Sequence, residues 1–131
     1  MRTFDAQFIK SVITDPEVWP WVSDGGSPAN YEPNMGEIYL RVGAGVMLFR
    51  PWAGAWWDVH IAMPRKCAAA VGFVGPAFQW MREQMGARGF VARMSSVNRA
   101  VLRLARAVGF KKCGRVRGCM RGHDMVLMEM N

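Results

Sequence analysis

Residues 98–110 read NRAVLRLARAVGF. Apolar side chains recur around this stretch at three- and four-residue intervals, at Val97, Val101, Leu104 and Val108. This spacing predicts an amphipathic helix that ends at Gly109 and takes its N-cap from Ser95-Ser96. Three basic residues fall on the opposite face, namely Arg99, Arg103 and Arg106. We therefore expect an exposed basic stripe along this helix.

Strand patterns flank the helix on both sides. Phe90–Met94 precedes it, and Lys112–Arg117 and Asp124–Met130 follow it. Further upstream, an apolar face with helical spacing is formed by Val71, Val74, Phe78, Met81 and Met85. This pattern predicts a long helix from Arg65, closed by Gly86 and Gly89 and kinked near Gly75, where glycine and proline oppose helix formation.

The first half of the chain predicts two helices and then three strands. Helical spacing covers residues 3–14, and Asp15-Pro16 starts a second short helix that runs through Trp21. Short β-branched and aromatic runs then predict strands at Ile38–Val42, Val46–Arg50 and Trp56–Met63. Five residues separate the last two runs, which suits a hairpin with antiparallel strands.

Size and composition favour one globular domain over residues 1–131, with N-terminal helices and a loop in 1–35 and the sheet in 36–131. A hydrophobic fraction of 51% with 21% charged residues excludes a disordered chain. No apolar run reaches the ~20 residues of a membrane helix, and no signal-peptide pattern opens the chain, so we expect a cytoplasmic protein that spans no membrane. Three cysteines without a C-x-x-C pair predict reduced thiols and no metal site.

Charge is distributed unevenly along the chain. Residues 1–40 hold two basic and six acidic residues, whereas residues 41–131 hold fifteen basic and four acidic residues. Between Glu83 and Asp124 there is no acidic residue, and ten residues there are basic. Such a segment suits nucleic acid, a phosphorylated cofactor or an acidic partner, and charge alone does not choose among them.

The turn before the long helix reads MPRKCAAA, residues 63–70. A strand, a short turn and a helix whose first turn is made of small residues can hold a pyrophosphate, because exposed N–H groups and the positive end of the helix dipole meet the anion. The alternative is that small residues there let the helix pack closely on the sheet.

Two segments together resemble the GNAT superfamily of N-acetyltransferases. Asn98, an apolar helix, Gly109-Phe110 and a following strand match one signature of that family. Residues 65–70 resemble its pyrophosphate motif, in which Gln or Arg is followed by two residues, Gly, one residue, and Gly or Ala. Arg65 stands at the first position, and Ala68 and Ala70 replace the two glycines. The resemblance covers residues 36–131 and is greatest to small acetyltransferase-like proteins of tailed bacteriophages.

The resemblance implies an α/β fold with a twisted, mixed sheet of six to seven strands and helices on both faces. It implies that acetyl-coenzyme A (acetyl-CoA) binds where two parallel strands splay apart, here Trp56–Met63 and Phe90–Met94. Backbone groups of Ile61 and Met63 would pair with the pantetheine arm, and Asn98 would lie near the thiol. The pyrophosphate would lie against Arg65, Lys66, Cys67, Ala68, Ala69 and Ala70. Apart from the resemblance, the basic stripe of Arg99, Arg103 and Arg106 suits the cofactor's 3′-phosphate and adenine or the phosphates of nucleic acid, and the alternative is a simply exposed face.

Two departures from the family concern catalysis. The family often places a tyrosine acid seven residues after the asparagine, where this chain has Ala105, and this chain has no glutamate on the third strand. Asp58 and His60 share one face of that strand, and an imidazole can act as a base near neutral pH. The alternative is that they form a packed, hydrogen-bonded pair.

The sequence therefore predicts acetyl transfer from a coenzyme A thioester to an amine of a small molecule or protein. The alternatives are a catalytically weak or inactive phage- or virion-associated binding protein of the same fold, and a basic nucleic-acid-binding protein. The expected location is the cytoplasm of a bacterial host, with virion association as a second possibility. The sequence does not indicate the oligomeric state.

Overall fold

The computed structural model describes residues 1–23, 25–64 and 71–131. The helices are α1 (Ala6–Ile13), α2 (Trp19–Val22), α3 (Val71–Met85) and α4 (Arg99–Val108), with a 3-10 turn at Pro28–Asn30. The strands are β1 (Ile38–Val42), β2 (Gly45–Pro51), β3 (Trp56–Ala62), β4 (Gly89–Ser95), β5 (Lys111–Met120) and β6 (His123–Met130).

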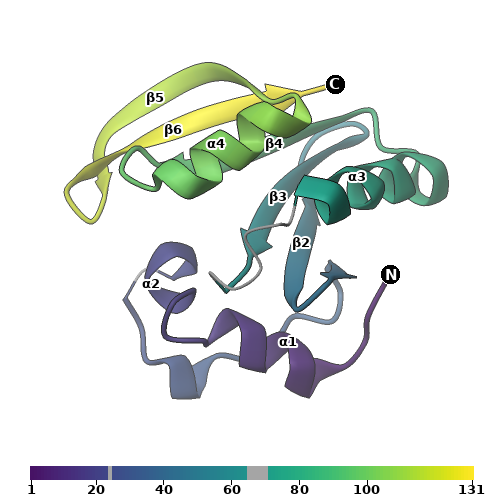
Figure 1. Ribbon diagram of the computed structural model, residues 1–131, viewed down its shortest axis with the longest axis horizontal. Coiled ribbons are helices and arrows are strands. Elements are labelled where there is room, and N and C mark those ends of the chain that lie inside the picture. The colour runs from purple at the N-terminus through teal and green to yellow at the C-terminus, as the bar shows by residue number, and fades with distance from the viewer. Residues whose placement is uncertain (24, 65–70) are drawn as a thin grey trace.

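These six strands form one mixed sheet in the order β1-β2-β3-β4-β6-β5 (Figure 1). Only β3 and β4 pair in parallel, and α3 connects them; the other neighbours are antiparallel. The fold class predicted from the sequence is confirmed, with six strands. The predicted helix from Arg65 is described only from Val71 onward, since Arg65–Ala70 lie outside the described residues.

The N-terminal helices begin later than the sequence pattern predicts. Asp5 caps α1 because its Oδ1 accepts the Phe8 N–H at 3.0 Å. Residues 15–18 form a turn in which the Asp15 carbonyl accepts the N–H of both Val18 and Trp19, so α2 begins only at Trp19.

The predicted N-cap of α4 was wrong. Ser95 is the last residue of β4 and pairs with Met125 of β6, so the strand runs further than expected. Asn98 caps the helix instead, its Oδ1 accepting the Val101 N–H at 3.4 Å. Leu102 and Ala105 are the buried residues of α4, and Val101, Leu104 and Val108 of the predicted face are partly buried and pack against the core, whereas Val97 is 45% exposed.

Two hydrophobic clusters cover the two faces of the sheet. Under α3 and α4, four rings pack edge to face with centroids 4.7–5.8 Å apart, those of Phe49, Phe78, Phe90 and Phe110. Under α1 and α2, a smaller cluster includes Ile9, Val12, Tyr39, Val46 and Leu48. Alternate residues of β2 and β3 therefore belong to different clusters, as the two-residue period of a strand requires.

The two edges of the sheet differ. Residues 1–3 lie along β1, where the Arg41 N–H donates to the Met1 carbonyl at 2.7 Å and the Thr3 N–H to the Tyr39 carbonyl at 2.9 Å. The opposite edge is β5, which pairs with β6 through two register shifts and is exposed along most of its length.

Candidate functional site

The parallel pair β3–β4 separates toward its carboxyl end. The last paired residues are Val59 and Ala92. Beyond them, β3 stays paired with β2 as far as Ala62, and β4 stays paired with β6 as far as Ser95. The two strands therefore follow different neighbours and leave an opening in the middle of the sheet.

Backbone groups of β3 face this opening. The Ala55 carbonyl accepts the Arg88 N–H at 2.7 Å on the β4 side, whereas the Trp56 carbonyl accepts the Trp52 N–H at 3.0 Å on the β2 side. Backbone direction alternates along a strand, so Ile61 points its N–H and C=O to the same side as Ala55. Ile61 lies beyond the last pair with β4, and these two groups can therefore serve an extended ligand.

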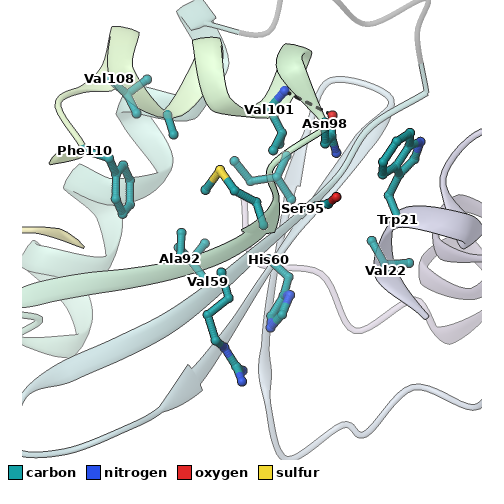
Figure 2. Close-up of a pocket in the computed structure, with 14 residues that line it drawn as sticks. Trp21, Val22, Val59, His60, Ala92, Ser95, Asn98, Val101, Val108 and Phe110 are labelled. Atoms are coloured by element: carbon teal, nitrogen blue, oxygen red, sulfur yellow. Dashed lines mark hydrogen bonds between the residues drawn. The ribbon is translucent and has the colours of Figure 1, made fainter. Parts of the chain in front are cut away.

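A pocket lies at this opening and is lined from both faces of the sheet (Figure 2). Val59 and Ile61 belong to the α3–α4 side, where α4 contributes Val101, Ala105 and Val108. The opposite side contributes His60, Arg93, Trp21 and Val22. The lining comes from both faces at the point where the two strands separate, and we call this pocket the splay passage.

Asn98 and Ala105 form part of the α4 wall of the splay passage. The Asn98 side chain uses its oxygen to cap the helix, which leaves its amide N–H groups as donors at the mouth (Figure 2). Ala105, where the family that the sequence resembles often has tyrosine, lines the passage and is 5% exposed. The described passage therefore has no phenol at this position.

Asp58, His60 and Arg93 form one hydrogen-bonded group on the face opposite α4. Asp58 Oδ2 accepts from Arg93 Nη2 at 2.6 Å and lies 3.2 Å from His60 Nε2. The Asp58 carboxylate is buried, while the side chains of His60 and Arg93 are 28% and 46% exposed. The predicted pairing of Asp58 with His60 is thus present, and Arg93 joins it.

The ionised form of Asp58 is favoured in this group. Burial alone raises the pKa of Asp58, but hydrogen bonds and charge from His60 and Arg93 outweigh it and hold the pKa below its ordinary value. Asp58 Oδ1 is buried and has no hydrogen-bond partner among the described residues. The carboxylate therefore acts through Oδ2, which orients both neighbours.

The remaining predicted site residues are not among the described residues that line the splay passage. Met63 follows β3 and packs partly against the α3–α4 cluster. Arg103 is exposed on α4 and does not line the splay passage, so its contact with a cofactor stays a prediction. The pyrophosphate residues Arg65–Ala70 lie outside the described part of the chain.

Arg93 is a site residue that the sequence did not single out. Arg93 is the only charged residue in β4, and a charge within an otherwise apolar strand signals that it needs a partner. Trp21 lines the splay passage, whereas Trp19 lies in a separate hollow beside Tyr31, and Trp52 is exposed at the β2–β3 turn.

Among the described residues, no group of three or more histidine, cysteine, aspartate or glutamate side chains could hold a metal ion. Within the same residues, no helix combines the length and the hydropathy needed to cross a membrane.

Several solved structures are similar to this chain in fold. The chain is similar to a GNAT-family acetyltransferase from Bacillus anthracis, with a TM-score of 0.71 and 14% identity over 95% of this chain and 87% of the other. It is similar to the ribosomal-protein-S5-alanine acetyltransferase of Vibrio fischeri, with a TM-score of 0.75 and 13% identity over 99% and 89%. A spermidine N-acetyltransferase variant from Vibrio cholerae gives 0.60 and 11% identity over 72% and 63%.

No protein-family model and no curated protein matches the sequence. At these low identities the structural likeness concerns the fold, and the fold of this chain is that of the GNAT acetyltransferases.

Proposed function

We propose that this chain, which has the GNAT fold, transfers an acetyl group from acetyl-CoA to an amine. The splay passage carries this proposal, because residues of both faces of the sheet line it where β3 and β4 separate. A thioester and an amine can enter such a passage from opposite faces and meet inside it. Holding two reactants in this way lowers the entropic part of the barrier.

The donor side of the splay passage, which faces α4, suits the extended, amide-bearing pantetheine arm of acetyl-CoA. The N–H and C=O of Ile61 face the opening and can pair with amides as a neighbouring strand would. Val101, Ala105 and Val108 supply an apolar wall, and the Asn98 amide is a donor at the mouth. Acetyl-CoA, when bound, supplies an activated thioester and a stable thiolate leaving group.

His60 is the base in this proposal. With Nε2–H donating to Asp58 Oδ2, the neutral ring keeps a lone pair on Nδ1. That lone pair can take the proton that the amine loses as its nitrogen forms a bond to the acetyl carbon and the carbon–sulfur bond breaks. The proton then leaves His60 to the thiolate or to water, and Asp58 stabilises the charged imidazole in between.

Turnover is expected to be slow. Ala105 stands where the family often has a tyrosine acid, and acid–base assistance contributes typically 10²- to 10⁴-fold. The second candidate of the same fold, a binding protein with little or no activity, rests on this residue. Acetyl-CoA binding without measurable thiol release would favour the second candidate.

The acceptor does not follow from the fold. One neighbour is named for alanine of a ribosomal protein and another for spermidine, which are chemically unlike acceptors. The bacteriophage relationship and virion association remain part of the proposal and rest on the sequence resemblance, and the cytoplasmic location remains an expectation from the sequence pattern.

Thiol release from acetyl-CoA, followed with a panel of peptide N-termini, lysine and polyamines, tests the proposal. His60→Ala should lower the rate by at least tenfold, whereas His123→Ala, at an exposed histidine that starts β6, should not change it. Equal rates for the two variants would remove His60 from the mechanism. No thiol release and no binding of millimolar acetyl-CoA by the unmodified protein would refute the proposed activity.

A nucleic-acid-binding role is a third candidate because Arg99, Arg103 and Arg106 are exposed on α4. Phosphate contacts would give a salt slope of about 0.9 per contact, and changing the three arginines to glutamine would reduce it. Failure to retain duplex DNA or RNA at low salt would exclude this candidate.

A further inference from the structure

The acceptor would enter the splay passage on the side opposite α4. The described lining there includes one arginine and no acidic residue, unlike a site built for polycations. We propose that the acceptor is a primary amine whose molecule also carries a carboxylate or phosphate a few bonds away, and that Arg93 recognises this anionic group. This inference rests on the proposed acetyl transfer and names the substrate class of the same site.

The first observation is the charge balance at the opening. Among the described residues that line the splay passage, Arg93 is the only arginine or lysine, and no aspartate or glutamate is present. Asp58 lies behind them, buried, with its Oδ2 engaged by both His60 and Arg93. An acceptor with a second ammonium group would therefore find no carboxylate oxygen open to it, because the ionised Asp58 is already paired with Arg93.

The second observation is the geometry of Arg93. Its guanidinium has five N–H donors in a planar fork, and its bond to Asp58 is made by Nη2 at 2.6 Å. The side chain is 46% exposed, so part of the fork remains open to solvent beside the passage. A planar fork matches the oxygens of a carboxylate or a phosphate, and Asp58 fixes its orientation.

The third observation is the closeness of Arg93 to the proposed base. Arg93 Nη2 and His60 Nε2 both contact the same Asp58 oxygen. When an amine reaches Nδ1 of His60, the atoms a few bonds away in the same acceptor molecule thus lie beside the Arg93 guanidinium. The anionic group must lie within a few bonds of the amine to use both contacts.

A second positive group lies near the α2 wall. Arg121, at the turn between β5 and β6, donates through Nη2 to the Ser23 carbonyl at 3.3 Å, and Ser23 directly follows α2. This cation adds to the positive potential around the acceptor side, although its contact with Ser23 is structural rather than part of the passage.

A matched series of four-carbon amines tests the inference: 4-aminobutanoate, 4-aminobutan-1-ol and 1,4-diaminobutane. These differ mainly in the charge of the far end, which is negative, neutral and positive. We expect kcat/KM for thiol release to fall in that order, by about tenfold from the anion to the alcohol, as one charge-assisted hydrogen bond allows.

Arg93→Gln should collapse the ratio of the anionic to the neutral amine toward one, and Arg93→Lys should give an intermediate ratio. Lys112→Gln removes an equal charge from the exposed edge strand β5 and should leave the ratio unchanged. The ratio reports on recognition even where Arg93→Gln also slows the chemistry through His60.

Several outcomes separate this inference from the proposed activity. A preference for 1,4-diaminobutane, or a ratio that Arg93→Gln does not change, overturns the inference while acetyl transfer stands. If none of the three amines is acetylated, calorimetric titration of each amine into the protein with coenzyme A decides. Tighter binding of 4-aminobutanoate that depends on Arg93 supports the inference, and equal or absent binding of the amines overturns it.

Discussion

The two faces of the sheet are built differently. The face under α3 and α4 is a continuous apolar cluster with four interlocking phenylalanine rings. The face under α1 and α2 is apolar over β1, β2 and the end of β3, but toward β4 it carries Asp58, His60 and Arg93. One face thus stabilises the fold, whereas the other holds the groups suited to proton transfer, and residues of both faces line the splay passage.

The largest effect on stability is expected on the α3–α4 face. Phe78→Ala removes the ring that contacts Phe49, Phe90 and Phe110, and such a change costs about 3–5 kcal/mol of unfolding free energy. Urea unfolding followed by circular dichroism measures it. A loss below 1 kcal/mol would show that this cluster does not hold the fold together.

Asp58→Asn should have a smaller effect that depends on pH. The variant removes the charge that pairs with Arg93 and His60, and we expect a loss of about 1–3 kcal/mol at neutral pH. The folded pKa of Asp58 lies below the unfolded value, so the stability it contributes is present above about pH 4 and is lost as pH falls through the folded pKa.

Comparing Asp58→Asn with the unmodified protein between pH 3 and pH 7 isolates this contribution. Asp124, whose pKa is also lowered by its hydrogen bonds from Gly118 and Arg115, is present in both proteins and therefore cancels. The difference in unfolding free energy should shrink toward acid. A difference that stays constant over this range would show that the charge of Asp58 does not matter.

The smallest effect is expected away from both faces. Arg103→Gln changes an exposed residue on the outside of α4, and surface changes of this kind stay within about 0.5 kcal/mol. Its thermal midpoint should match that of the unmodified protein. A larger loss of stability would mean that Arg103 has a partner that the exposed position does not suggest.

Local pattern sufficed for most elements of the fold. Alternation and composition located β1 from Ile38 to Val42, because each apolar run was bounded by turn residues. The start of α4 was misplaced, since local preference for serine at an N-cap competed with the pairing of Ser95 to Met125, a contact across 30 residues. Cap identity therefore depended on where a distant strand stops.

The site could be predicted only where its residues are close in sequence. Asp58 and His60 are two residues apart, so the period of a strand placed them together. Arg93 reaches Asp58 across 35 residues, and that contact requires the register of β3 against β4. The resemblance supplied the splay and Asn98, but neither the resemblance nor the spacing indicated Arg93.

The central claim is that the splay passage admits the donor. Calorimetric titration of acetyl-CoA into two variants tests this claim. Ala105→Phe adds a ring inside the passage, and the control Ala107→Phe adds the same ring at an exposed position of α4. Thermal unfolding checks that both variants are folded, and Val101→Phe replaces Ala105→Phe if the latter is not. We predict binding by the unmodified protein and by Ala107→Phe, and at least tenfold weaker binding by the passage variant. Unchanged affinity in the passage variant, or no binding heat from the unmodified protein at millimolar acetyl-CoA, would contradict the account.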